Sequence, residues 1–163
     1  MRSLQMCIIN TMDYKTDEEK MKVALEQAEI AMSNNEVPVG AALFDKKDNL
    51  ICANHNRREL DQNPISHAEI LVLTEASKIF GSWRLDGTTI AVTLEPDVMC
   101  AGAIVLSRVK KLIYGTHNLK SGGAFTLYNI PQDPRLNHHV DIVDSVLSDS
   151  SEKLMAEFFK SRR

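Results

Sequence analysis

Apolar and polar residues alternate with two different periods along this chain, and the periods predict its elements. Helical spacing follows Thr16, which forms a capping-box pattern with Glu19, and it recurs after Ser66, after Pro96 and over 149–160. Short, mostly apolar runs predict five strands, at 37–44, 50–54, 88–94, 109–114 and 140–143. Strands that alternate with helices in this way predict an α/β protein, a three-layer α/β/α sandwich around a mixed five-stranded sheet.

Length and composition are typical of one globular domain. The chain has 163 residues, of which 44% are hydrophobic and 25% charged. No run approaches the roughly 20 apolar residues of a membrane span, so we expect no membrane association. We expect residues 1–15 to form a poorly ordered N-terminal extension and residues 16–163 to form the domain. Three cysteines cannot all pair, which argues against a disulfide framework and favours the reducing cytoplasm.

The net charge of −3 counts mildly against a nucleic-acid partner. A basic groove can nevertheless exist on an acidic protein. We interpret the lysine pairs 46–47 and 110–111 as solvated surface charge. The basic C-terminal run 160–163 is a better candidate for RNA contact, because it follows Phe158 and Phe159.

Two segments carry the candidate chemistry. The first is Ser66-His67-Ala68-Glu69, and the second is Pro96-Asp97-Val98-Met99-Cys100. Together they nearly match the His-x-Glu … Pro-Cys-x-x-Cys motif of zinc-dependent nucleobase deaminases, with Asp97 at the place of the first cysteine. In that motif the histidine and cysteines bind zinc and the glutamate moves protons. Both segments stand at predicted helix starts, where the helix dipole favours anionic thiolate and carboxylate groups.

Each motif residue also has a simpler interpretation. Ser66 and Glu69 fit a capping box. Asp97 fits a favourable negative charge in a first helical turn. Cys100 alone fits a small buried hydrophobe, and His67 alone fits a hydrogen-bonded histidine. The deaminase interpretation is favoured because all of them occur together at this spacing.

Almost the whole chain, roughly residues 17 to 163, resembles the bacterial tRNA-specific adenosine deaminases, which convert the wobble adenosine of a tRNA anticodon to inosine. The zinc motif alone also fits cytidine, cytosine, guanine and deoxycytidylate deaminases. The tRNA branch is favoured by the run 99–103, by Asn137-His138 and by the basic end of the last helix. Further matching segments are Glu36–Ala41, Asn56, Pro64–Ile70, Val92–Pro96, Tyr114-Gly115 and Phe158–Arg163.

The resemblance implies a cytidine-deaminase-like fold and a hydrolase that uses one Zn²⁺ per chain. It implies His67 and Cys100 as zinc ligands and Glu69 as the proton donor. It also implies a cytoplasmic homodimer, with a tRNA anticodon stem-loop as partner. It implies Asn56 as a contact to the flipped base, and Pro64, Ile65 and Leu94 to Pro96 as residues that line the substrate pocket. We add as candidate RNA contacts Lys120, Lys160, Arg162 and Arg163.

Two positions depart from the family pattern. Where this chain has Asn118, an acidic residue facing the RNA is expected, and we keep Asn118 as a substrate-binding candidate. Where this chain has Asp97, the family has a zinc-binding cysteine. A carboxylate oxygen binds zinc at about 2.0–2.2 Å and carries the same formal charge as a thiolate.

Three hypotheses follow from Asp97. A site of His67, Asp97 and Cys100 could hold zinc and support deamination. Alternatively, the site is metal-poor and the chain is inactive. In the third hypothesis the chain binds tRNA without chemistry. A deaminase of free nucleobases or nucleosides is the alternative enzyme.

Overall fold

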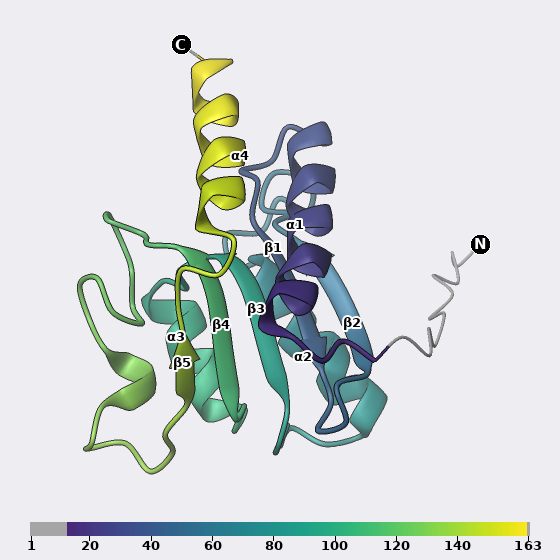
Figure 1. Ribbon diagram of the computed structural model, residues 1–163, viewed down its shortest axis with the longest axis vertical. Helices are drawn as coiled ribbons and strands as arrows, with labels where there is room; N and C mark the ends of the chain where they lie inside the picture. The colour runs from purple at the N-terminus through teal and green to yellow at the C-terminus, as the bar shows by residue number, and fades with distance from the viewer. Residues whose placement is uncertain (1–12, 163) are drawn as a thin grey trace.

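The computed structural model describes residues 13–162, which form a five-stranded sheet between two layers of helices (Figure 1). The strand order is β2-β1-β3-β4-β5. Strand β1 pairs antiparallel with β2 and β3, and β3, β4 and β5 run parallel, so the predicted mixed sheet is confirmed. The strands are β1 (Gly40–Phe44), β2 (Leu50–His55), β3 (Thr89–Leu94), β4 (Lys111–Thr116) and β5 (Asp141–Val143). The helices are α1 (Asp17–Ser33), α2 (Ala68–Phe80), α3 (Val98–Leu106), α4 (Ser148–Lys160) and the 3-10 turn η1 (Ile130–Gln132).

Alternate residues of each central strand face opposite helical layers. In Figure 1, α1 and α4 lie side by side in front of the sheet, and α2 and α3 lie behind it. Ala42 and Phe44 of β1 pack with the apolar face of α1. Ala41 and Leu43 pack with α2 and α3 instead. Because side chains alternate between the two faces of a strand, each inner strand contributes residues to both hydrophobic cores, as expected for a sheet covered on both faces.

Helix α1 begins as the sequence predicts. Thr16 is its N-cap, and both hydrogen bonds of the capping box with Glu19 are present. The helix lies very close to the start of β1, because a Cβ at Gly40 would collide with the Ala24 carbonyl oxygen and meet the Ala28 nitrogen at 2.5 Å. A glycine at position 40 is therefore required by the packing of α1 on the sheet.

Other element ends differ from the sequence prediction. Strand β1 begins at Gly40 rather than at residue 37, because a tight turn from Val37 to Val39 precedes it. Helix α2 begins at Ala68 with His67 as its N-cap, so the capping-box interpretation, which needs Ser66 at that place, is wrong. Helix α3 begins at Val98 rather than directly after Pro96, since the residue between them is the N-cap.

The prediction for residues 1–15 falls mostly outside the described residues. Within that segment, Asp13 forms an isolated bridge with Asn49, and the Tyr14 ring packs edge-on against Phe44 with centroids 5.3 Å apart. None of the helices between residues 13 and 162 combines the length and the apolar character that crossing a membrane demands.

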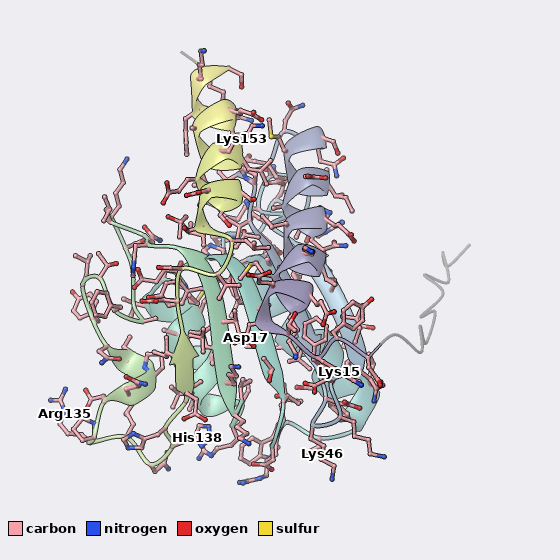
Figure 2. All side chains as sticks on the ribbon, in the orientation of Figure 1. Lys15, Asp17, Lys46, Arg135, His138 and Lys153 are labelled. Carbon is pink, nitrogen blue, oxygen red and sulfur yellow. The ribbon has the colours of Figure 1, made fainter. Side chains whose placement is uncertain are left out.

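Basic side chains are spread over the molecule. Figure 2 shows Lys46 and Arg135 at the lower end on opposite sides, and Lys153 at the upper end on α4. Arg135 is paired with Asp133, with nitrogen and oxygen 2.6 Å apart.

The cap of α1 gives a direct test of the fold. Thr16→Ala removes the side-chain acceptor for the Glu19 amide and should lower the free energy of unfolding by about 1 kcal/mol. Thr74→Ala, on the exposed face of α2, is the matched control and should raise that free energy by about 0.5 kcal/mol because alanine has the higher helix propensity. Urea unfolding of both variants measures the difference, and equal effects would contradict the role of Thr16.

Candidate functional site

The first turns of α2 and α3 meet behind the sheet and bring the two motif segments together. His67 is the N-cap of α2 and Asp97 the N-cap of α3. His67 Nδ1 lies 3.2 Å from Asp97 Oδ2 and 3.5 Å from Cys100 Sγ. The second carboxylate oxygen, Asp97 Oδ1, accepts a hydrogen bond of 2.9 Å from the Cys100 backbone N–H. One carboxylate thus caps a helix and faces the histidine at the same time.

Glu69 and Cys100 form the buried end of this group. Glu69 is 4% exposed and Cys100 is fully buried. One ligand atom each of His67, Glu69 and Cys100 lie within 4.8 Å of one another. Among residues 13–162, His67, Glu69 and Cys100 are the group of three that could hold a metal ion, and Asp97 lies beside this group through its contact with His67.

Charges within the group are set by burial and by the His67–Asp97 contact. Hydrogen bonding to Asp97 raises the pKa of His67 against the opposing effect of burial. Burial opposes ionisation of Asp97, but hydrogen bonds from His67 and from the Cys100 amide hold its pKa below the ordinary value. Burial raises the pKa of Glu69 to about 7 and also raises the pKa of the Cys100 thiol. The contact therefore favours a protonated His67 beside an ionised Asp97, and the inner carboxyl group of Glu69 readily keeps a proton.

Two separations between the donor atoms match those expected around a tetrahedral zinc ion. Zinc bonds of about 2.0–2.3 Å at tetrahedral angles place two ligand atoms about 3.3–3.6 Å apart. The separations of His67 Nδ1 from Asp97 Oδ2 and Cys100 Sγ are 3.2 and 3.5 Å. Nitrogen, oxygen and sulfur donors are all zinc ligands, and three protein ligands leave one position open, as catalytic zinc requires.

We call His67, Glu69, Asp97 and Cys100 together the donor group. A cavity of about 650 Å³ opens above it, and this volume is within the usual range of small-molecule sites. His67, Glu69 and Asp97 lie on its floor. Three sequence-predicted substrate residues, Asn56, Leu94 and Asn118, line it, and so does Lys120. Helix α4 closes one side with Met155, Ala156 and Phe159.

The amide of Asn56 is held in a fixed orientation at the cavity wall. Its Nδ2 donates to Glu36 Oε2 at 3.4 Å and to the Val37 carbonyl at 3.3 Å. Glu36 is 1% exposed, and its other oxygen accepts from the Leu60 amide at 2.7 Å. Glu36 belongs to a segment that matches the family, but its residue type and position predicted no role for it.

Several predicted site residues do not line the cavity. Pro64, Ile65 and Pro96 are absent from its lining, and Ile65 is 52% exposed in the turn before α2. Lys160 and Arg162 lie at the end of α4, beyond the lining residue Phe159. Arg162 stacks 4.0 Å from the Phe158 ring centroid. The prediction for Arg163 lies outside the described residues.

Glu95 lines the cavity, as expected for a residue of the stretch Leu94 to Pro96, and His117 lines it without having been assigned a role from the sequence. Glu95 follows β3 directly, and His117 follows β4 directly. Polar residues at the carboxyl ends of adjacent parallel strands gather at one edge of a sheet. The position of both residues directly after a strand could therefore have indicated that they line the site.

Comparison with known proteins gives one consistent family. The family model for MafB19-like deaminases matches residues 15–163. The tRNA-specific adenosine deaminase of Bacillus subtilis is 45% identical over 147 residues, which cover 90% of this chain and 91% of the relative. A structure from a study of A-to-I editing by tRNA:A34 deaminases has a TM-score of 0.79 at 32% identity, covering 83% of this chain and 97% of that one. The guanine deaminase of Nitrosomonas europaea, at 24% identity and a TM-score of 0.73, covers 88% of this chain and 84% of its own, and shows the fold alone.

The two contacts of Asp97 can be separated by substitution. Asp97→Ala removes the cap of α3 and the ion pair, and should lower the free energy of unfolding by about 1–2 kcal/mol. Asp97→Asn keeps an acceptor for the Cys100 amide, so its loss should be smaller. Urea unfolding in the presence of a chelator measures both without a contribution from metal. Equal losses in the two variants would show that the cap is not what Asp97 contributes.

Proposed function

Because this chain belongs to the MafB19-like deaminases, in the family of tRNA-specific adenosine deaminases, we propose that it deaminates the wobble adenosine of a tRNA anticodon to inosine. The observation that carries the proposal is that His67, Glu69 and Asp97 meet on the floor of one cavity, with the buried Cys100 Sγ 3.5 Å from His67 Nδ1. Asn56 and Asn118 supply polar groups on the walls above them. Hydrolysis of a base amine needs a metal-ligand set, a proton carrier and groups that orient the base, and this cavity contains residues suited to each task.

The residues that would hold zinc are His67, Asp97 and Cys100. When bound, zinc makes water a stronger nucleophile at neutral pH by lowering its pKa. Its positive charge would also favour the thiolate form of Cys100 and the neutral form of His67, which are the forms that act as ligands. Asp97 can present Oδ2 to a metal while Oδ1 keeps its hydrogen bond to the Cys100 amide.

Glu69 is the proton carrier in this proposal. Its buried carboxyl lies beside His67 and Cys100 and lines the cavity, so it can reach both the attacking water and the base. Glu69 takes a proton from the water as oxygen bonds to C6 of adenine. It delivers this proton to the ring nitrogen. It then moves the second proton, from the new C6 hydroxyl group, to the amine, so that the C6–N bond breaks, ammonia leaves and C6 keeps a carbonyl oxygen.

The remaining residues orient the RNA. The Asn56 amide is fixed, because its Nδ2 donates to Glu36 and to the Val37 carbonyl. In this orientation Asn56 offers its amide oxygen to the edge of the flipped base. Lys120 meets the phosphates at the cavity rim, and Lys160 and Arg162 extend that contact along α4 beyond Phe159. A splayed anticodon loop suits such a site, because unstacked bases expose their edges and faces. A tRNA substrate also favours the cytoplasm as the place of action.

We also propose that two copies of the chain form a homodimer at the rim of this cavity. Large apolar side chains stay exposed on the loop after β4, where Leu119 is 78% and Phe125 66% exposed. Val98, in the first turn of α3, is 48% exposed. It lies beside this loop, because the Gly123 amide donates a hydrogen bond to the Pro96 carbonyl. A second copy covering these side chains would bury them and would complete the RNA surface next to Lys120.

One observation favours a metal-poor tRNA-binding chain as the second candidate. His67 and Asp97 satisfy each other at 3.2 Å, so the group is electrostatically stable without a metal. This candidate predicts binding of the anticodon stem-loop with no inosine and no zinc.

The role of Glu69 is tested by Glu69→Ala, with Glu75→Ala on the exposed face of α2 as the matched control. Glu69→Ala should reduce inosine formation on an anticodon stem-loop by at least about 10³-fold, while RNA binding and zinc content stay unchanged. Zinc per chain is measured by metal mass spectrometry. Wild-type turnover in Glu69→Ala would refute the assignment, and loss of zinc would identify Glu69 as the third ligand in place of Asp97.

The role of Asp97 in metal binding is tested by Asp97→Cys. Thiolate is the more strongly donating ligand, so the variant should hold zinc more tightly in competition with a chelator and should deaminate at least as fast as the wild-type chain. Competition with a chromogenic chelator measures the affinity. If zinc content, affinity and rate are all unchanged, position 97 does not contribute a ligand.

A further inference from the structure

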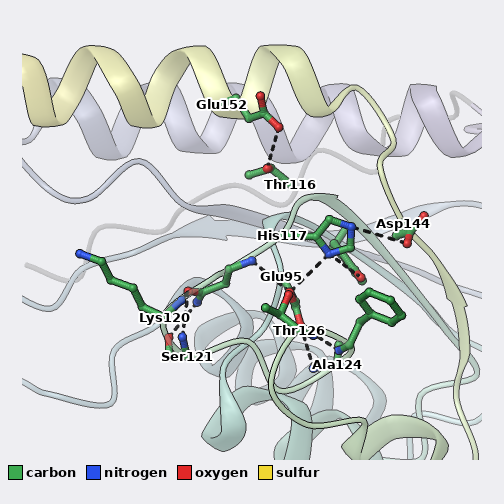
Figure 3. A network of polar contacts seen from close by, with 12 residues as sticks. Glu95, Thr116, His117, Lys120, Ser121, Ala124, Thr126, Asp144 and Glu152 are labelled. Atoms are coloured by element: carbon green, nitrogen blue, oxygen red, sulfur yellow. Dashed lines mark hydrogen bonds and ion pairs between the residues drawn. The ribbon is translucent and has the colours of Figure 1, made fainter.

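Glu95 is a buried acidic residue that binds the loop 117–126 rather than the donor group. Its side chain is 1% exposed, and it lies between the end of β3 and the N-cap of α3. One carboxylate oxygen accepts hydrogen bonds from the backbone amides of Ala124, Phe125 and Thr126, at 3.2, 2.8 and 2.8 Å. The other accepts from the Asn118 amide at 3.0 Å and from the Thr126 hydroxyl (Figure 3).

Both ends of the loop are thereby fastened to one side chain. The Asn118 donor lies two residues after β4, and the Ala124–Thr126 donors lie at the far end of the loop. The backbone supports the same closure, because the Glu95 amide donates to the Thr116 carbonyl at 2.8 Å. The Gly123 amide donates to the Pro96 carbonyl, also at 2.8 Å.

Two glycines make room for this contact. A Cβ at Gly122 would meet Glu95 Oε1 at 2.5 Å, and a Cβ at Gly123 would meet the Asp97 carbonyl oxygen at 2.8 Å. Real Cβ atoms do not approach so closely, so the loop can lie on residues 95–97 only with glycine at these places. The loop therefore rests directly on the backbone that carries Asp97.

The middle of the same loop forms one wall of the cavity. Asn118, Lys120 and Ser121 line it. They also form a closed turn, in which Asn118 Oδ1 accepts from the Lys120 and Ser121 amides at 3.3 and 3.1 Å. Asn118 Nδ2 in turn donates to Ser121 Oγ at 2.8 Å. The turn is rigid within itself, so its position depends on the contacts at its two ends.

A carboxylate is the only side-chain group that suits the place of Glu95. Five donors point at it, and a carboxylate accepts on both oxygens, whereas the amide of glutamine would turn an NH₂ toward some of those donors. Burial opposes ionisation of Glu95, but the hydrogen bonds from Thr126, Asn118 and Phe125 hold its pKa below the ordinary value. His117, the first residue of the loop, also lies near this carboxylate, with Nδ1 3.6 Å from Glu95 Oε2.

We propose that Glu95 is a positioning residue, which holds the loop 117–126 as a cavity wall at a fixed distance from His67, Asp97 and Cys100. The importance of this wall for RNA rests on the proposed function. Loss of the carboxylate should let the loop move away from residues 95–97, so that Asn118 and Lys120 no longer meet the RNA in register. Misplacement of such contacts raises KM more than it lowers kcat.

The test is Glu95→Gln, with Glu152→Gln as the matched control. Glu152 is an exposed glutamate that accepts one hydrogen bond of 3.0 Å from the Thr116 hydroxyl, and it does not line the cavity (Figure 3). Glu95→Gln should speed amide hydrogen exchange over residues 118–126 by about 10-fold or more in the RNA-free protein. Its KM for an anticodon stem-loop should rise about 10- to 100-fold, while zinc content is retained. Glu152→Gln should change neither quantity.

Three outcomes would overturn the proposal. The first is unchanged exchange over residues 118–126 in Glu95→Gln. The second is faster exchange with unchanged KM. The third is a fall in kcat together with loss of zinc, which would place Glu95 in support of the donor group. If Glu95→Gln does not fold, Thr126→Val removes one donor and must show the same changes at smaller size. If the wild-type chain makes no inosine, the proposed function fails, and the stem-loop dissociation constant replaces KM as the second measurement.

Discussion

The meeting of the first turns of α2 and α3 is the constraint on which the rest of the site depends. Both helices pack on the same face of the sheet, so their first turns bring two distant segments of the chain within 3.5 Å. Asp97 links the two turns, because one oxygen caps α3 and the other pairs with His67. A residue that could make only one of these contacts would leave either the helix or the histidine unsatisfied. Cavity, donor group and adjoining loop are all arranged around that contact.

Four buried or half-buried acidic residues surround this point, and their surroundings give them different tasks. Glu36 and Glu95 accept hydrogen bonds from backbone amides, which suits them to hold loops and neighbouring side chains in place. Asp97 is ionised beside His67. Glu69 is the one whose pKa burial raises, to about 7. Acidic groups whose environments push their pKa values apart are typical of sites that move protons, and this difference supports Glu69 as the proton carrier.

Local patterns were sufficient to predict the fold, and the family resemblance pointed to Asn56 and Leu94 in the cavity lining, but the contacts that hold the cavity walls in place were not predictable. The capping box at Thr16 and the strand periods depend on neighbouring residues, and they are confirmed. The start of α2 was ambiguous, because Ser66 offers a capping pattern that the chain does not use. The role of Glu95 could not be predicted, since its partners lie 23 to 31 residues away and most of them are backbone amides, which no sequence pattern displays. Whether Pro64, Ile65 and Pro96 contact RNA stays a prediction.

The most direct measurement is inosine formation by the wild-type, zinc-loaded chain on two anticodon stem-loops. One carries adenosine at the wobble position, and the other carries it at a different loop position. Free adenosine is measured in parallel, and inosine is quantified by mass spectrometry of the nucleosides. Our account predicts inosine from the wobble adenosine alone, with one zinc per chain. Absence of inosine despite bound zinc, or equal turnover of free adenosine, would contradict it.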